Sequence, residues 1–410
     1  MVGGVRILIV SDFLDPENPG GASRYLRESA RALARRGRAV SVVSGLERPR
    51  PPEIREGVHY RWFPYDPYRG GAWAHWSALR KPLRAAIRDE NADGSFDAVM
   101  FHQPASARSA LGTDQIRRLP AGYLCHSPWP LEHAAAGGGR FGVMIRRHVE
   151  RTVLEKMPVI LTLSRYMAGE TARVHDLTPD RFRVVGAGVD PDRFRPTGDR
   201  AGVRRALEVP DGCPLWLTVR RLVPRMGIDL LLEAAAIRRR TGTDFRLVVA
   251  GTGPLRAALE AQTASLGLGD RVRFAGLVPE GDLPGLYSAA DAFVLPTREL
   301  EGFGLVLVEA LACGVPGIGT PVGAIPEILG KVEPAWIAAA ASPEALADRL
   351  AALPFPVPEG LRQKCRGTVM REFTWDAVAE RIEAGYQQIL NGTNNNQLST
   401  TNKHPTSNNQ

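Results

Sequence analysis

The chain has 410 residues, of which 44% are hydrophobic and 23% are charged, a balance typical of a soluble globular protein with room for two domains. No apolar run approaches the roughly 18–20 residues of a membrane-spanning helix. Asp12 interrupts the apolar start where a signal peptide would still be hydrophobic. These features argue against a membrane-spanning chain and predict a cytoplasmic location.

The formal net charge is +8, which admits nucleic acid, an anionic membrane surface or a phosphorylated ligand as partner. Arginine clusters such as "AIRRR" (236–240) are typical of a solvated helix end, so we expect no nucleic acid. The cysteines lack metal-ligand spacing and are expected to be small buried hydrophobes. They are Cys125, Cys213, Cys313 and Cys365. We expect neither a metal nor a cofactor.

Short β-branched runs alternate with helical periodicity through the first half of the chain. Continuous apolar strands between helices indicate a parallel sheet that is buried on both faces. A helical stripe after the first run ends at Gly37 and comprises Ala22, Tyr25, Leu26, Ala30 and Leu33. The predicted strands are 5–10, 39–44, 96–101, 121–125 and 158–164.

The same pattern restarts in the second half, and one doubly wound sheet seldom takes so many strands. The second series comprises 214–219, 245–251, 271–276, 291–296 and 314–320. The predicted fold is therefore α/β, with two Rossmann-like doubly wound domains facing each other across a cleft.

The predicted boundaries follow composition. Residues 1–195 and 203–371 form the two domains, and 188–203 is a polar, proline-bearing linker. Residues 372–390 form an amphipathic helix that packs back on the first domain. Residues 391–410 are rich in Asn, Ser and Thr, and we expect this tail to be disordered.

Ligands of such folds bind at the carboxyl ends of the parallel strands. Gly20 and Gly21 open a helix after the first strand, where free N–H groups favour an anion, although a plain turn accounts for them equally. His126 follows the strand 121–125, where a structural histidine is the alternative. Arg220, Arg221 and Arg225 follow the strand 214–219, and their guanidinium groups suit phosphate oxygens. A solvated loop is the weaker explanation for three arginines at the end of one strand.

The stretch "EGFGLVLVEALACGVP" contains two carboxylates in different settings. Glu301 lies in a glycine-bearing loop, and Glu309 lies in the second turn of a helix whose other residues are almost all apolar. A carboxylate buried without a partner costs several kcal/mol, so Glu309 needs one, and sugar or ribose hydroxyls are suitable. The N–H groups around Gly302–Gly304 suit a diphosphate.

Two other motifs carry little weight. Asp190 and Asp192 read like a metal-binding Asp-x-Asp but lie in the predicted linker. "GTGPLR" from Gly251 lacks the third glycine of a dinucleotide fingerprint, which disfavours a Rossmann oxidoreductase.

The whole chain resembles the retaining nucleotide-sugar glycosyltransferases of family 4, which have the GT-B fold. The resemblance runs from Gly20 to about Trp375, and its most specific element is the pair of glutamates separated by seven residues. Supporting stretches occur in the family's order: "GASRYLRESARALARRG", "GAGVDPDRFRP", "VAGTGP", "VRFAGLVP" and "LYSAADAFVLPT".

The resemblance implies roles for these residues. Glu301 is expected to contact the transferred sugar, Glu309 the ribose, and Arg221 the diphosphate, while His126 lies beside the reacting sugar. Gly20 and Gly21 would approach the phosphates. The implied catalytic residues are His126, Arg221 and Glu301, and the implied donor site also includes Arg225, Gly302, Phe303, Gly304 and Leu305. The first domain would bind the acceptor and the second the nucleotide sugar.

One departure from the family pattern concerns a positive charge. Where the family usually has Lys before Gly, this chain has Met226 before Gly227, and we expect Arg225 to supply the second diphosphate cation. A second departure places Ala324 where a glycine pair is common, which is sterically mild.

The resemblance implies metal-independent transfer of a hexose from a nucleoside diphosphate sugar to an acceptor hydroxyl, with retention by front-face attack. The acceptor is a small molecule, a lipid-linked compound or a glycan, in specialised metabolism or cell-envelope synthesis. The basic amphipathic helix 141–157 either rests on an anionic membrane or is a packed surface helix. A same-fold epimerase, a phosphorylase and a non-catalytic sugar-nucleotide-binding protein are the alternatives.

Overall fold

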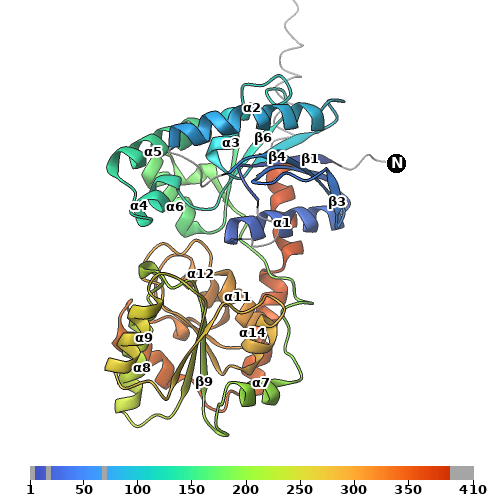
Figure 1. Cartoon of the computed structure of the whole chain (residues 1–410). Coiled ribbons are helices and arrows are strands. Elements are labelled where there is room, and N and C mark those ends of the chain that lie inside the picture. The colour runs from blue at the N-terminus through green and yellow to red at the C-terminus, as the bar shows by residue number, and fades with distance from the viewer. Residues whose placement is uncertain (1–4, 15–19, 67–71, 388–410) are drawn as a thin grey trace, which may run out of the picture. The chain divides into compact units, whose positions relative to one another are not determined.

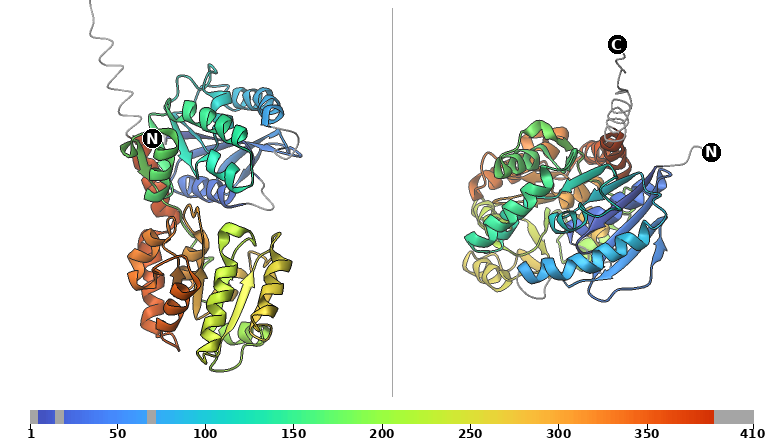
Figure 2. Two further views of the ribbon diagram at one scale, coloured as in Figure 1. Left: turned by 90° about the vertical axis from the view of Figure 1, so that its left-hand side faces the viewer. Right: turned by 90° about the horizontal axis from the view of Figure 1, so that it is seen from above.

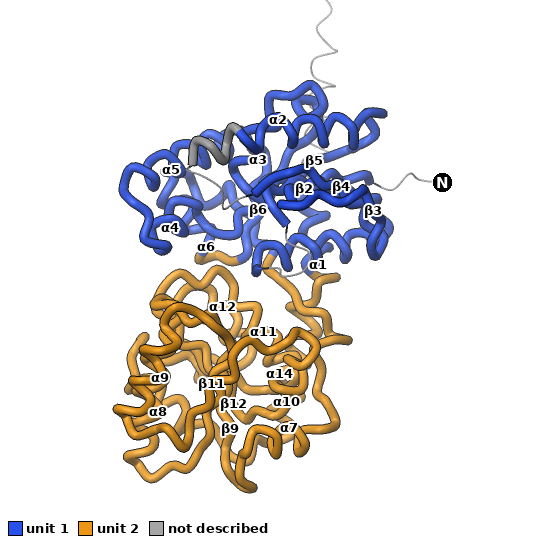
Figure 3. The backbone as a smooth tube through the Cα atoms, viewed as in Figure 1, with its two compact units in different colours: residues 1–163, 167–185, 378–410 blue, residues 164–166, 186–377 orange. Residues whose placement is uncertain are grey.

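The computed structural model of the chain describes residues 5–14, 20–66 and 72–387 (Figure 1). The described residues form two compact units, which Figure 3 distinguishes by colour. The first unit contains residues up to Leu163, Met167–Val185 and the described residues from Val378 on. The second unit contains Ser164–Tyr166 and Gly186–Ala377. The predicted tail 391–410 and the predicted helical residues 388–390 lie outside the described residues.

The first unit is built on an eight-stranded sheet with the order β3-β4-β2-β1-β5-β6-β7-β8. Every neighbouring pair is parallel except β3 with β4. The chain runs outward from β1 to β2 and then returns to the other side of β1 with β5. The strands are β1 (Arg6–Ser11), β2 (Ala39–Leu46), β3 (Glu53–Arg55), β4 (Val58–Pro64), β5 (Ala98–Phe101), β6 (Ala121–Cys125), β7 (Val159–Thr162) and β8 (Phe182–Val184).

Helices cover both faces of this sheet, which is why its central strands are almost entirely buried. Helix α1 lies on one face, and α2, α3 and α5 lie on the other (Figure 1). The helices are α1 (Gly21–Arg35), α2 (Ala72–Glu90), α3 (Pro104–Ala110), α4 (Trp129–Ala135), α5 (Arg140–Leu154) and α6 (Arg165–His175). As predicted, the first helix is followed by Gly37, whose φ of +82° no β-branched residue would adopt readily.

The second unit has a fully parallel five-stranded sheet with the order β11-β10-β9-β12-β13. Its strands are β9 (Leu215–Val219), β10 (Arg246–Ala250), β11 (Val272–Gly276), β12 (Ala292–Leu295) and β13 (Gly317–Gly319). The order reverses between β9 and β12, so this is the topological switch point where doubly wound sheets bind ligands.

Helices also cover both faces of the second sheet. Helices α8 (Ile228–Arg240) and α9 (Arg256–Ser265) lie on one face, and α11 (Leu305–Ala312) and α14 (Glu359–Glu372) lie on the other (Figure 1 and Figure 2). The remaining helices are α7 (Arg200–Ala206), α10 (Leu283–Ala289), α12 (Ile325–Val332) and α13 (Pro343–Ala352), with short 3₁₀ turns η1 (Pro179–Arg181), η2 (Pro224–Met226) and η3 (Pro334–Trp336).

The predicted fold class is confirmed, because each unit is a Rossmann-like α/β layer structure with a parallel sheet. All ten predicted strands are present within two or three residues of their expected bounds. Strands β3, β4 and β8 were not predicted. In β4, buried residues alternate with half-buried His59 and Arg61, so the segment lacks the continuous apolar run on which the prediction relied.

The final predicted helix, 372–390, begins at residue 375, three residues later than predicted. Helix α14 ends at Glu372, and residues 375–387 are again helical. Between them, Thr374 pairs with Val189 and its Oγ1 accepts a hydrogen bond from Ala377 N at 3.3 Å, which caps the new helix.

The helix 375–387 contributes to the core of the first unit from its residue 378 on. The hydroxyl of Tyr386 donates to the carbonyl of Val99 at 3.3 Å. Gly122 of β6 makes room for this ring, since an added Cβ there would lie 3.0 Å from the Tyr386 hydroxyl. Glu383 accepts hydrogen bonds from Arg36 Nη2 at 2.9 Å and from Arg38 Nε at 2.8 Å.

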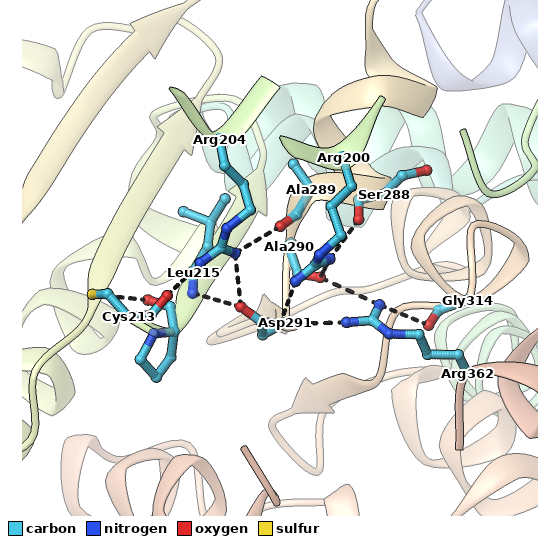
Figure 4. Close-up of polar contacts among 11 residues, drawn as sticks. Arg200, Arg204, Cys213, Leu215, Ser288, Ala289, Ala290, Asp291, Gly314 and Arg362 are labelled. Atoms are coloured by element: carbon cyan, nitrogen blue, oxygen red, sulfur yellow. Dashed lines mark hydrogen bonds and ion pairs between the residues drawn. The ribbon is translucent and has the colours of Figure 1, made fainter. Parts of the chain in front are cut away.

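A buried carboxylate organises the amino-terminal end of the second sheet (Figure 4). Asp291, which precedes β12, accepts a hydrogen bond from Leu215 N at 2.9 Å, so it joins the starts of two neighbouring strands. Arg200, Arg204 and Arg362 form ion pairs with it. The same arginines donate to backbone carbonyls of Ser288, Ala289, Ala290, Cys213 and Gly314. Their role is therefore to stabilise the fold at this end of the sheet.

The four cysteines are buried and unpaired, as predicted. Among the described residues, no helix combines the length and apolarity that crossing a bilayer requires.

Candidate functional site

The switch point of the second sheet brings together two of the predicted site segments. Strands β9 and β12 are neighbours in register Trp216↔Ala292 and Leu217↔Phe293. Arg220 follows β9, and the loop that carries Glu301 follows β12, so both emerge at the carboxyl edge of adjacent parallel strands.

Arg220 and Glu301 form a buried ion pair at this edge. Arg220 Nη2 lies 2.7 Å from Glu301 Oε2, and the two side chains are only 6% and 11% exposed. The hydroxyl of Thr297 lies 3.3 Å from both of these atoms. A charge-assisted hydrogen bond between such groups is about twice as strong as a neutral one, so the orientation of the Glu301 carboxylate is fixed before any ligand arrives.

The backbone of this loop is held as firmly as the carboxylate. Arg225 Nη1 donates to the carbonyl of Leu300 at 2.9 Å, and Leu300 has a φ of +54°. A non-glycine residue in this region is strained. Ala324 N donates to the carbonyl of Glu301 at 3.0 Å, and an added Cβ at Gly323 would lie 2.3 Å from that same oxygen. The position of Glu301 therefore depends on contacts from two other segments.

Arg221 differs from its neighbour Arg220 in that it is exposed. Within the described part of the chain its guanidinium has no hydrogen-bond or ion-pair partner. It therefore offers all of its donors to a ligand at the end of β9, and such donors suit phosphate oxygens.

Glu309 has the protein partner that its burial demands. The side chain lies in α11 and Glu309 is 2% exposed. The hydroxyl of Tyr287, in α10, donates to Glu309 Oε2 at 2.8 Å. Part of the hydrogen-bonding capacity that we expected a ribose to satisfy is thus met by tyrosine, and contact with the ribose stays a prediction.

The residues between the glutamates shape the start of α11. Gly304 has a φ of +92° and precedes the first residue of the helix, Leu305. Phe303 is 7% exposed and packs edge-to-face on Phe373 with ring centroids 6.0 Å apart, so its side chain belongs to the core. Gly302, Phe303, Gly304 and Leu305 can therefore serve a ligand through their backbone, at a helix N-terminus that favours anions.

The first unit has a second cluster at the carboxyl edge of its own sheet. His126 follows β6, and its Nε2 lies 3.2 Å from Nδ1 of His102, which follows β5. The ring of Tyr25 in α1 packs edge-on against His126 with centroids 5.3 Å apart. His102 is 2% exposed, and within the described residues its Nε2 has no hydrogen-bond partner.

Burial keeps both histidines neutral at ordinary pH. Desolvation lowers the pKa of His126 to about 4. Desolvation, and then the proximity of His126, lower the pKa of His102 well below its usual value. His126 is therefore a neutral hydrogen-bonding group and carries no charge near pH 7.

Asp12 follows β1 at the same edge. Its Oδ1 accepts a hydrogen bond from Ser106 N at 2.6 Å, which anchors the start of α3. Burial raises the pKa of Asp12 to about 6, although hydrogen bonds from Ser106 oppose this.

Gly20 precedes α1 and Gly21 is its first residue, and the described residues give neither position a structural reason to be glycine. Gly20 has an ordinary φ of −62°. Among the described residues, an added Cβ at either position would meet nothing within 4 Å. A glycine that neither backbone conformation nor packing requires is consistent with close approach by a ligand.

Comparisons with known proteins show which family the chain belongs to. Residues 19–193 match the family model described as Glycosyltransferase Family 4, and residues 199–353 match Glycosyl transferases group 1. The D-inositol 3-phosphate glycosyltransferase of Acidothermus cellulolyticus is 32% identical over 90% of this chain and 86% of that protein. The enzyme of the same name from Frankia alni is 31% identical over 90% of this chain and 95% of its own length. The chain belongs to glycosyltransferase family 4.

Solved structures agree with the two-domain GT-B fold of family 4. Sucrose-phosphate synthase from Thermosynechococcus elongatus has a TM-score of 0.77 at 24% identity, over 95% of this chain and 100% of that one. Anabaena HepE in complex with UDP and glucose has a TM-score of 0.72 at 17% identity, over 94% of this chain and 100% of that one. At these identities the likeness supports the fold alone.

In this family 4 glycosyltransferase, the structure brings Glu301, Arg225 and the loop to Leu305 together in the second unit, with Glu309 in the helix that follows. It places His126, Gly20 and Gly21 at one edge of the first sheet. The sequence did not predict which protein groups contact the site residues. Three such groups were missed, namely Thr297 beside Glu301, Tyr287 beside Glu309 and His102 beside His126. Tyr287 and Thr297 lie inside a stretch that supported the family resemblance, and His102 follows a predicted strand as His126 does. Position after a strand was therefore a usable signal for His102.

Proposed function

We propose that this glycosyltransferase moves a hexose from a nucleoside diphosphate sugar to an acceptor hydroxyl with retention of configuration and without a metal ion. The observation that carries the proposal is the oriented Glu301 carboxylate, paired with Arg220 at 2.7 Å, beside the exposed Arg221 at the switch point. A fixed carboxylate suits sugar hydroxyls, and a free guanidinium suits a diphosphate.

The proposed role of the protein is mainly electrostatic. Negative charge develops on the departing diphosphate, and preorganised donors directed at it lower the barrier most effectively. Arg221 and the N–H groups that begin α11 and α1 are the donors proposed here. Neither Glu301 nor Glu309 is assigned a proton transfer, and both carboxylates are proposed to bind the donor. The departing phosphate takes the acceptor proton in the front-face route.

The acceptor is proposed from relatives. Proteins 29–33% identical to this chain are named D-inositol 3-phosphate glycosyltransferases, so a small phosphorylated polyol is the first acceptor to test. Glycans, lipid-linked compounds and specialised metabolites complete the panel. The net charge of +8 favours an anionic acceptor among these.

A membrane contact through α5 is a second part of the proposal, alongside a cytoplasmic location. Phe141, Met144 and Ile145 lie on one side of this helix by their spacing, and they are 71%, 60% and 38% exposed. Arg140 and Arg147 border them. Exposed apolar residues with flanking arginines are typical of helices that lie on anionic bilayers.

The decisive experiment incubates the full chain with UDP-, ADP- and GDP-linked hexoses and the acceptor panel, and follows release of nucleoside diphosphate. We expect release that depends on acceptor, a product whose anomeric NMR coupling matches that of the donor, and no loss of rate in EDTA. An inverted product or EDTA-sensitive turnover would contradict those parts of the proposal. Interconversion of donor sugars without transfer would favour an epimerase, and binding without turnover would favour a sugar-nucleotide-binding protein.

The membrane contact is tested by co-sedimentation with vesicles containing anionic phospholipid. Wild-type protein is expected to pellet with anionic vesicles and a Phe141→Ser/Met144→Ser variant is not. Equal sedimentation of the two proteins would show that α5 does not bind the bilayer.

A further inference from the structure

Met226 occupies a position where the family that the chain resembles usually has a lysine, and the structure shows which charge lies beside it. Met226 is 6% exposed, and its sulfur is in contact with Nη2 of Arg220. The same Nη2 atom lies 2.7 Å from Glu301 Oε2. Arg220 Nη2 therefore contacts both the sulfur of Met226 and the carboxylate of Glu301.

We propose that Arg220 is a positioning residue that supplies the positive charge beside Glu301, in place of the cation absent at Met226, and that it acts on the donor through the Glu301 carboxylate. Arg225 was expected from the sequence to supply the second diphosphate cation. Its Nη1 donates to the carbonyl of Leu300 and so stabilises the backbone of the loop. The proposal rests on the proposed function, because Glu301 is taken to bind the transferred sugar.

The backbone around Arg220 fixes where its side chain begins. Arg220 N donates to the carbonyl of Ala250 at 2.9 Å. Gly251 has a φ of +130°, and an added Cβ there would lie 1.9 Å from the carbonyl oxygen of Arg220. The close crossing of these two backbone segments and the hydrogen bond to Ala250 fix the main chain at position 220.

The packing of Arg220 leaves one of its donors unused. Its Nε is buried, and among the described residues it has no hydrogen-bond partner. Arg238, Arg271 and Arg349 share this feature, so the proposal depends on the contacts of Arg220 Nη2 with Glu301 and Met226.

Moving the positive charge from position 220 to position 226 tests the proposal. Methionine and lysine have unbranched side chains of similar length, so Met226→Lys places an ammonium beside Glu301. The variants are Arg220→Met, Arg220→Lys, Arg225→Met, Met226→Lys and the double variant Arg220→Met/Met226→Lys. Arg256→Met is the matched control, because Arg256 pairs with the exposed Glu260 in α9 and is assigned no part in the site.

We expect Arg220→Met to lower kcat/KM by a factor of about 10–150, the equivalent of one charge-assisted hydrogen bond. The loss should fall mainly on kcat, since a preoriented Glu301 matters most in the transition state. The double variant should recover at least about tenfold of that loss, Arg220→Lys should retain part of the activity, and Arg256→Met should match wild type. A larger loss in Arg225→Met than in Arg220→Met, or a double variant no better than Arg220→Met, overturns the proposal.

Thermal unfolding requires no substrate, so it tests the role of Arg220 independently of the proposed sugar transfer. Thermal unfolding of the same variants is expected to show a Tm lower by roughly 6–20 °C in Arg220→Met, because Glu301 is left buried without its cation. Part of that loss should return in the double variant, where the ammonium introduced at position 226 would pair with Glu301. If wild type transfers no sugar but the Tm recovers, the proposed function fails and the charge replacement stands. If transfer occurs but neither Tm nor kcat recovers, the charge replacement fails alone.

Discussion

His102 Nδ1 lies 3.2 Å from His126 Nε2, although the two histidines follow different strands. Both rings are neutral, so one of these nitrogens must carry a proton and donate the hydrogen bond, and the other must accept that hydrogen bond. If His126 donated, Nε2 of His102 would be a buried N–H with no partner among the described residues, which is costlier than a buried unused acceptor. His102 is therefore expected to donate, which leaves the proton of His126 on Nδ1 and makes that atom a donor toward a ligand.

The first prediction concerns the titration of His126, whose pKa is lowered by burial to about 4. Above pH 6.5 the ring is neutral in both folded and unfolded chains. As pH falls from 6.5 toward 4 the unfolded chain binds a proton that the folded chain does not, so stability is lost on acidification. NMR titration, with the resonance assigned by a His126→Asn variant, is expected to give a midpoint near 4. A midpoint near 6.5 would contradict the burial argument, and ¹⁵N shifts report the tautomer directly.

The second prediction concerns the hydroxyl that faces Glu309. Tyr287→Phe removes a donor from a carboxylate that is 2% exposed, and we expect a loss of about 1–3 kcal/mol in unfolding free energy. Urea unfolding measures it. Tyr60→Phe is the comparison, because the hydroxyl of Tyr60 has no hydrogen bond within the described part of the chain. Equal effects of the two changes would show that the bond to Glu309 adds nothing.

The third prediction concerns Asp291, which three arginines surround (Figure 4). Asp291→Asn keeps the shape but removes the charge, and it leaves those arginines without a counter-ion at a nearly buried position. We expect a loss of about 3–5 kcal/mol in stability. Glu260→Ala, which breaks an exposed pair in α9, should cost no more than about 0.5 kcal/mol. Calorimetry on both variants separates the two cases.

The fourth prediction concerns Glu383 and acid stability. Burial raises the pKa of Glu383, but hydrogen bonds from Arg38 and Arg36 outweigh it, so the pKa lies below its ordinary value of 4.5. The ion pairs are therefore intact above pH 4.5 and are lost as pH falls through the depressed pKa. Glu383→Gln should lower stability by about 1–3 kcal/mol at pH 7, with a smaller difference from wild type in acid. Glu155→Gln, at an exposed pair with Arg151, is the control. A difference that stays constant with pH would refute the assignment.

The fifth prediction concerns the glycines at the start of α1. Gly21→Ala adds a methyl group at a helical position where no described residue lies within 4 Å of it, so the Tm should be unchanged or slightly higher. If a donor phosphate approaches this backbone, its KM should rise about tenfold, the loss of one hydrogen bond. An unchanged KM would place the phosphate elsewhere.

The sequence predicted the strands well where both faces are buried, since short continuous apolar runs such as 5–10 are typical of the central strands of a parallel sheet. It could not decide between consecutive arginines. Arg220 and Arg221 are chemically identical, and which of them turns toward Glu301 depends on how β9 ends against Gly251. The partner of Glu309 was likewise beyond reach, because Tyr287 is 22 residues away and meets it only through helix packing.

The first unit contains segments from before and after the second unit, and this affects the order in which the two units can fold. Its sheet is synthesised first, yet the helix that brings Tyr386 against Gly122 and Glu383 against Arg36 emerges after the entire second unit. During translation the first unit therefore exposes the apolar surface on β6 and β7 that this helix will cover, while the second unit can already fold to completion. Chains truncated after Ala377 and released from the ribosome should show a protease-resistant second unit and a first unit that is still labile.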